Sequence, residues 1–320
     1  MNRFFLLRVM IILTFSVSSA WAQKEIQLSI ATGGMGGVYY SLGRVMADIL
    51  SQYSPYADIK AEESKGIVNN CLMVNTGKAD LALVRADIGW DAFQGKGRFR
   101  EKIPLRTVAV LYPSNMHIVT LEGLSIQKVT DFKGKRVSTG APGSGTEAES
   151  LRILEAYGLN ANKDIVKERL GPSESAGALR DRKIDAYFWD GGLPTASITD
   201  LGATPGIKMK LIGHEDVIPK MRQKYGPSYV KGIIPAKTYP GQETDVPIVV
   251  VWNLLICHEK MKEDILYDIL KTCFNHKSEL VGRHREARWL SLETQAAGCS
   301  PIPFHPGAIR YFVERGLKIK

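Results

Sequence analysis

Short apolar segments alternate with segments of helical periodicity along most of the chain. Ile26, Leu28 and Ile30 alternate with polar residues, as in a half-buried strand, and residues 38–53 then carry apolar side chains three or four positions apart. The alternation of strand and helix continues to about residue 225. This pattern predicts an α/β fold with mainly parallel sheets.

The expected elements follow from the same reading. Strands are expected at residues 26–32, 58–62, 79–85, 106–112, 116–121, 164–169, 184–189, 208–212 and 248–256, with another through Val137. Helices are expected at 38–53, 66–76, 87–93, 173–182, 215–224, 260–280 and 308–315, with others opening near Ser144 and after 191–194. The Pro- and Gly-rich residues 226–247 are expected to form a long surface connection.

Two glycine-rich turns each lie between an expected strand and an expected helix, at residues 33–37 and 140–146. The first N–H groups of a helix have no partner inside it and carry partial positive charge, so such turns favour anions. The alternative is a capped turn that binds nothing. Residues 77–85 and 182–190 also resemble each other, because each holds a turn with Asp and a buried strand. Two similar units of this kind predict two lobes that face each other across a cleft.

Length and composition are those of a globular protein that can hold two domains, with 320 residues, 44% hydrophobic and 23% charged. Residues 1–22 carry Arg3 and Arg8, then a short apolar run, then Ala20-Trp21-Ala22. They predict a cleavable signal peptide and a periplasmic protein, with an uncleaved membrane anchor as the alternative.

Other classes of function find little support. The net charge is +9, but Lys and Arg are spread along the chain, so nucleic acid is not an expected partner and the positive field would gather small anions. The four cysteines and six histidines show no metal-ligand spacing, and the cysteines are expected to be buried free thiols, with one disulfide possible. The glycine turns match neither a dinucleotide fingerprint nor a nucleophile elbow. An enzyme, a cofactor and a metal are therefore not expected.

Several motifs occur together in one order, at residues 30–40, 77–84, 134–147, 184–186, 192–194 and 302–307. With these motifs the chain closely resembles the TAXI family of solute-binding proteins for TRAP transporters, over essentially the whole mature sequence. The resemblance implies a two-lobed periplasmic-binding-protein type II fold. It implies a monomer that delivers a small carboxylate, such as glutamate, glutamine or 2-oxoglutarate, to TRAP membrane subunits driven by an ion gradient.

The resemblance also implies the site. The residues expected to contact the ligand are Gly34, Met35, Gly36, Gly37, Tyr39, Tyr40, Arg85, Ser144, Gly145, Thr146, Asp190 and Gly191. Which of the two tyrosines faces the ligand stays open. By analogy with the type II fold, residues 23–115 and 248–320 form one lobe and residues 116–247 the other, with a hinge near 113–115 and Pro247.

Two positions depart from the pattern of the family and govern the choice of ligand. Position 85 is more often Gln and position 190 more often Thr, whereas this chain has Arg85 and Asp190. Arg85 ends a buried strand, so it is expected either to clamp a ligand carboxylate or to pair with Asp190 or another lobe carboxylate. A clamp favours a C4–C5 dicarboxylate such as 2-oxoglutarate. An ammonium group on Asp190 favours glutamate instead. A periplasmic sensor subunit is a further alternative.

Overall fold

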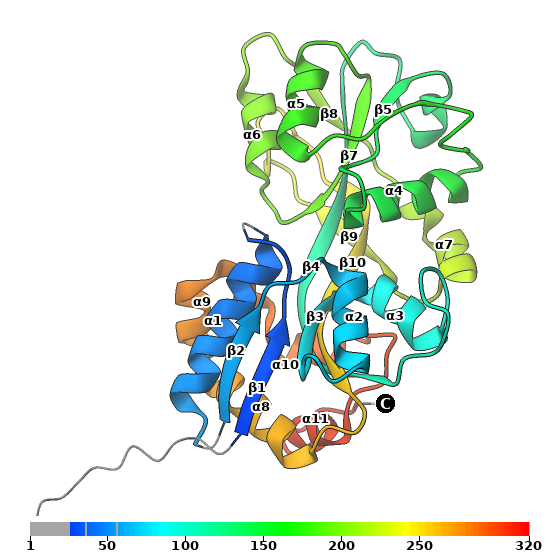
Figure 1. Ribbon diagram of the computed structural model, residues 1–320. Helices are drawn as coiled ribbons and strands as arrows, with labels where there is room; N and C mark the ends of the chain where they lie inside the picture. Colours follow the sequence, from blue (N-terminus) through cyan, green and yellow to red (C-terminus); the bar gives the residue numbers. More distant parts are fainter. Residues whose placement is uncertain (1–25, 36, 56, 320) are drawn as a thin grey trace, which may run out of the picture.

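The computed structural model describes residues 26–35, 37–55 and 57–319 (Figure 1). The expected signal peptide, residues 1–22, and the expected site residue Gly36 lie outside this range. Every strand that follows belongs to one mixed sheet, whose order is β2-β1-β3-β10-β4-β7-β5-β6, with β8 paired to β4 and β9 paired to β10.

The strands are β1 Ile26–Ala31, β2 Ala57–Glu62, β3 Leu81–Arg85, β4 Leu105–Leu121, β5 Arg136–Ser138, β6 Val166–Glu168, β7 Ala186–Gly191, β8 Met209–Leu211, β9 Tyr229–Ile234 and β10 Val246–His258. The α-helices are α1 Val38–Tyr53, α2 Ile67–Asn75, α3 Ala86–Gln94, α4 Gly145–Ala156, α5 Pro172–Arg180, α6 Ala196–Ala203, α7 Ile218–Tyr225, α8 Glu263–Asn275, α9 Lys277–Arg283, α10 Leu292–Ala296 and α11 Pro306–Val313. The short 3₁₀ helices in the described residues are η1 Val129–Phe132, η2 Glu215–Val217 and η3 Arg285–Trp289.

Two lobes share the two long strands β4 and β10, which run from one lobe into the other (Figure 1). We call the half built on β1, β2 and β3 lobe I and the half built on β5, β6 and β7 lobe II. Pairing is parallel inside each of these two groups, but antiparallel wherever β4 or β10 takes part. The expectation of mainly parallel sheets is therefore wrong for the middle of the sheet, because the strands that return between lobes must run in both directions.

The expected break at residues 113–115 is also wrong, because β4 continues through it. Pro113 has no N–H to donate, and the ladder with β10 is irregular beside it, with a register shift between Trp252 and Leu254. The side chain of Asn253 compensates, since its Nδ2 donates to Tyr112 O and to Ser114 Oγ, each at 3.0 Å. The strand pairs with β10 up to Asn115 and with β7 from Asn115 onward.

Two other segments differ from expectation. The connection 226–247 contains the strand β9, which pairs antiparallel with residues 246–251 of β10. Its sequence hid this because Gly232 weakens the strand pattern, yet a side chain there would collide with Val250 at 2.2 Å. The expected helix 260–280 is two helices, α8 and α9, which are separated at His276, whose ring stacks on Tyr53.

The core extends along β4 and β10 and joins the lobes. In lobe I the helix α1 buries a stripe of Leu42, Met46, Ile49 and Leu50, and each such side chain contributes roughly 1.5–3 kcal/mol. The same cluster reaches Val137, Phe132 and Ile153 of lobe II, and a smaller cluster with Tyr187 and Leu201 covers the other part of lobe II. All four cysteines are buried and unpaired.

The lobe boundaries at 115/116 and 247/248 remain a prediction. Along β4 the partner changes from β10 to β7 near Asn115. Along β10 the residues that pair with β9 end at Val251 and those that pair with β3 begin at Asn253, so Pro247 lies in the part of β10 that pairs with β9, opposite Ile233. No helix among the described residues is long and apolar enough to cross a membrane.

Candidate functional site

The carboxyl ends of β3 and β7 meet near the middle of the long strands, from opposite lobes. Arg85, the last residue of β3, pairs with Asn253 of β10, and Gly191, the last residue of β7, pairs with Asn115 of β4. Ligands of α/β proteins bind outside such strand ends. The register therefore brings two of the expected site residues, Arg85 and Asp190, to one place between the lobes.

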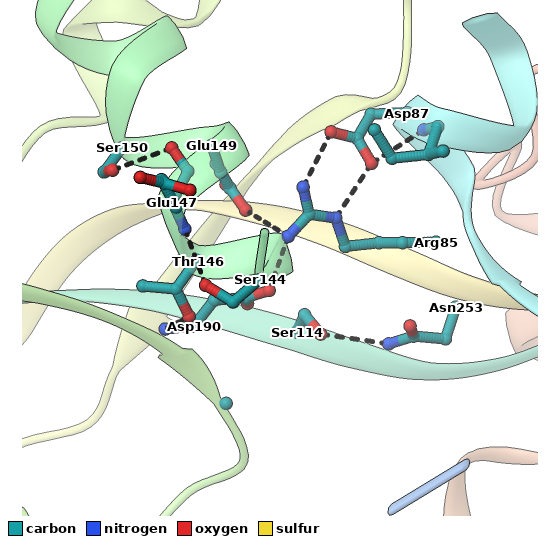
Figure 2. A network of polar contacts seen from close by, with 12 residues as sticks. Arg85, Asp87, Ser114, Ser144, Thr146, Glu147, Glu149, Ser150, Asp190 and Asn253 are labelled. Atoms are coloured by element: carbon teal, nitrogen blue, oxygen red, sulfur yellow. Dashed lines mark hydrogen bonds and ion pairs between the residues drawn. The ribbon is translucent and has the colours of Figure 1, made fainter. Parts of the chain in front are cut away.

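Arg85 is 1% exposed and is surrounded by carboxylates (Figure 2). Its Nε and Nη2 donate to the two oxygens of Asp87 in lobe I, both at 2.8 Å. Its Nη1 lies 2.6 Å from Asp190 Oδ2 and 3.2 Å from Glu149 Oε2, and both of these residues belong to lobe II. The guanidinium thus links the lobes and makes the ion pair that was one of its two expected roles. The clamp on a ligand carboxylate remains a prediction.

A second arginine strengthens the same link from the opposite direction. Arg152 of α4 in lobe II places Nη1 3.1 Å from Asp87 Oδ2 and Nη2 2.5 Å from Asp91 Oδ2, and it donates to the Tyr229 hydroxyl at 2.7 Å. We call the six residues Arg85, Asp87, Asp91, Glu149, Arg152 and Asp190 the interlobe cluster. It contains four carboxyl groups and two guanidinium groups.

Burial and pairing act differently on these carboxyl groups. Burial favours the neutral form of Asp87, but Arg85, Arg152 and the N–H of Ile88 outweigh it and hold the pKa of Asp87 below its usual value. Burial raises the pKa of Asp190 in spite of Arg85, and it raises the pKa of Glu149 well above its usual value. Burial also raises the pKa of Asp91 in lobe I, so among the four carboxyl groups only Asp87 has a lowered pKa.

Next to the cluster, a chain of hydrogen bonds connects α1 with the long strands. The Tyr39 hydroxyl donates to Asn253 Oδ1 at 2.6 Å, and Asn253 in turn binds Ser114. Tyr40 instead lies beside Arg44, whose guanidinium carbon is 6.0 Å from the ring centre. Of the two tyrosines, Tyr39 is thus the one that points toward the strands that join the lobes.

The turn before α4 uses part of its hydrogen-bonding capacity internally. Ser144 caps the helix and accepts from Glu147 N at 3.1 Å, while Gly143 N donates to the Glu147 carboxylate at 2.8 Å. Thr146 Oγ1 accepts from Asp190 N at 3.3 Å. A Cβ on Gly145 would lie 2.9 Å from Arg85 Nη1, so glycine is needed here for the arginine to reach lobe II.

The other glycine turn lies apart from the cluster. Gly34, Met35 and Gly37 are exposed, and the Met35 side chain is 74% exposed. Met35 N donates to Glu63 Oε1 at 3.3 Å, and Gly37 N donates to Gly34 O at 3.2 Å. The structure therefore brings together Tyr39, Arg85, Gly145, Thr146 and Asp190, and it leaves the described part of this turn open to solvent.

Two cavities adjoin the cluster and the long strands. One, of about 280 Å³, lies between α2 and α3 of lobe I and the start of α4, and its walls include Ile67, Ile88, Ser144, Gly145 and Arg152. The other, of about 480 Å³, is more apolar and lies between η3, the loop after β7 and the long strands. It is lined in part by Pro113, Leu193, Pro194, Trp252 and Trp289.

Sequence reasoning missed six members of this site: Asp87, Asp91, Glu149, Arg152, Ser114 and Asn253. The available signal was the spacing of charges, since Asp87 and Asp91 are four residues apart and Glu149 and Arg152 three, which places each pair on one helix face. Nothing in the sequence shows that these faces are buried. No group of three or more His, Cys, Asp or Glu in the described ranges is placed to hold a metal.

Comparison with known proteins agrees with this architecture. Residues 30–316 match the sequence pattern of a family described as the NMT1-like family. The periplasmic aliphatic sulphonate binding protein SsuA from Escherichia coli is 16% identical, with 90% of each chain covered and a TM-score of 0.50. A putative periplasmic sulfonate-binding protein SsuA from Methylobacillus flagellatus KT is 13% identical, with 93% of this chain and 98% of that chain covered and a TM-score of 0.52. These structures share the mixed α/β periplasmic-binding-protein fold.

Proposed function

The chain belongs to the NMT1-like family, and on this premise we propose that it is an extracytoplasmic solute-binding protein of a transporter. The proposal rests on four residues that come together between the lobes at the ends of their strands and helices. Arg85 and Tyr39 belong to lobe I, and Asp190 and Thr146 belong to lobe II. A small solute held there would contact both lobes at once. The fold shared with two proteins named for sulfonate binding supports the same class.

The transporter type and location are finer parts of the proposal. The ordered motifs at 30–40, 77–84 and 134–147 support a TRAP permease as the membrane partner. Residues 1–22 support export to the periplasm. The protein acts in this proposal as a binding subunit and not as an enzyme.

For the solute we propose a C4–C5 dicarboxylate, and among these one that carries an ammonium group, such as glutamate, over 2-oxoglutarate. The guanidinium of Arg85 is already matched by Asp87 and Asp190, so a solute carboxylate placed on it would leave a buried carboxylate without a counterion. Asp190 Oδ1 has no hydrogen-bond donor among the described residues and can accept one from an ammonium group. The solute carboxylate would lie at the start of α4.

A thermal-shift screen of C4–C5 carboxylates and amino acids tests the proposal. A solute at about 100 times its Kd stabilises the protein by about 2.7 kcal/mol. Absence of any shift across this panel contradicts the solute class, and turnover of a bound compound contradicts the binding role. Loss of solute uptake after gene deletion distinguishes a transporter subunit from a sensor subunit, which leaves uptake intact.

Asp190→Asn tests the choice between the two dicarboxylates. Loss of the charge should weaken glutamate binding by about 2–5 kcal/mol, the usual cost of removing one partner of a buried charge pair, and should change 2-oxoglutarate binding much less. Asp185→Asn is the matched control, since Asp185 lies just before β7 and pairs with Arg136 away from the cluster. Equal losses for both solutes would show that Asp190 does not contact the ammonium group.

A further inference from the structure

The interlobe cluster holds more buried carboxyl groups than its arginines can neutralise. Asp87 is matched by two bonds from Arg85, and Asp91 by Arg152. Glu149 and Asp190 then share a single nitrogen, Arg85 Nη1, at 3.2 and 2.6 Å. Two carboxylates that share one guanidinium nitrogen in a buried place repel each other.

Glu149 is the less satisfied of the two. Its side chain is 0% exposed, and neither of its oxygens has a hydrogen-bond partner in the described part of the chain. An ionised carboxylate in such a place is expensive, and the usual response is that the group binds a proton and becomes neutral. Burial is the main cause that raises the pKa of Glu149, and the negative charges of Asp190 and Asp87 raise it further. The positive charges of Arg85 and Arg152 lower this pKa, but they do not reverse the direction of the shift.

We propose that Glu149 is a proton-binding site, which is filled while the two lobes are in contact as they are here. The charged and titratable groups that act on it directly are Arg85 of β3, Asp87 of α3, Arg152 of α4, Asp190 of β7 and Tyr229 of β9. Asp91 of α3 lies behind Arg152, and Tyr39 of α1 lies near Arg85 and Asp190.

The proton has a structural role in this proposal. It removes one negative charge from the cluster, so that Asp190 alone takes the short bond with Arg85. Because Arg85 and Glu149 belong to different lobes, separation of the lobes brings water to Glu149 and releases the proton. Closure of the lobes therefore takes up one proton from solution.

The test compares the pH dependence of unfolding in the wild type and in Glu149→Gln, without any solute. A buried carboxyl group of this kind has a higher pKa in the folded protein than in the unfolded protein. Its contribution to stability is fully present below the unfolded pKa. This contribution is lost as pH rises toward the folded pKa. In the wild type, the unfolding equilibrium constant should rise by up to tenfold per pH unit, relative to Glu149→Gln, as pH rises above about 5.

Glu147→Gln is the matched control. Glu147 lies on the same helix, but it pairs with Arg169, and that partner together with the N–H of Gly143 keeps its pKa low in spite of burial. This variant should keep the wild-type slope above about pH 5. Parallel curves for the wild type and Glu149→Gln would overturn the proposal.

An infrared measurement on the wild-type protein gives the same answer without a variant. A protonated carboxyl group has a carbonyl stretch that a carboxylate lacks. With isotopically labelled glutamate, that band should persist in the folded protein at neutral pH and disappear on unfolding. Its absence from the folded protein would overturn the proposal. A failed solute screen would bear on the proposed function and would leave both measurements valid.

Discussion

Arg85→Gln is the most informative single change in this protein, because one guanidinium neutralises carboxyl groups from both lobes. The substitution leaves Asp87 with Arg152 as its remaining cation and Asp190 with none of its present ion pairs. Removal of one partner from a buried ion pair costs about 3–5 kcal/mol, since the other charge stays buried. We expect a loss of this size in the free energy of urea-induced unfolding at neutral pH.

The loss should depend on pH in a defined direction. Burial raises the pKa of Asp190 against the opposing effect of Arg85, so removal of Arg85 raises it further. A carboxyl group with a raised folded pKa is destabilising above its unfolded pKa and harmless below it. The difference between the wild type and Arg85→Gln should therefore shrink as pH falls toward about 4.

A matched control and a refuting result complete the test. Arg136→Gln removes an arginine whose 2.7 Å pair with Asp185 is partly exposed, and such pairs contribute only about 0–1 kcal/mol. The reasoning is refuted when Arg85→Gln and Arg136→Gln have the same stability at neutral pH. If Arg85→Gln stays folded and binds the native solute as tightly as the wild type, the carboxylate clamp is wrong as well.

Two further predictions concern the residues around Arg85. Gly145→Val should weaken solute binding and stability more than Ser144→Ala. A Cβ at position 145 would lie 2.9 Å from Arg85 Nη1. Ser144→Ala removes only the helix cap, which contributes about 1 kcal/mol of stability. Urea unfolding and calorimetric titration check this, and equal effects would contradict it. Tyr39→Phe should cost about 0.5–1.5 kcal/mol of stability through the lost 2.6 Å bond to Asn253, and Tyr40→Phe, the control, should cost less.

The sequence predicts those parts of the fold that depend on local periodicity. The strand and helix around Ile30 and Leu42 appear where the pattern places them, since each buries one face against its neighbours. The middle of β4 was not predictable in this way. Pro113 ends a strand by local rules, and only the side chain of Asn253, 140 positions further along, supplies the bonds that let β4 continue. A compensation between residues so distant in sequence leaves no local pattern.

The same distinction between local pattern and tertiary contact separates the site residues that the sequence predicts from those that it does not. Strand ends are visible in sequence, and Arg85 and Asp190 were expected to lie near each other because both follow buried strands. Glu149 was invisible because a glutamate in an amphipathic helix is ordinarily solvated, and its burial depends on α4 packing against the end of β3 from the other lobe. The same cause determines its chemistry. The partners of Glu149 lie on the other lobe, so its charge depends on whether the lobes are in contact. Proton binding to Glu149 and contact between the lobes are therefore coupled, and each shifts the equilibrium of the other.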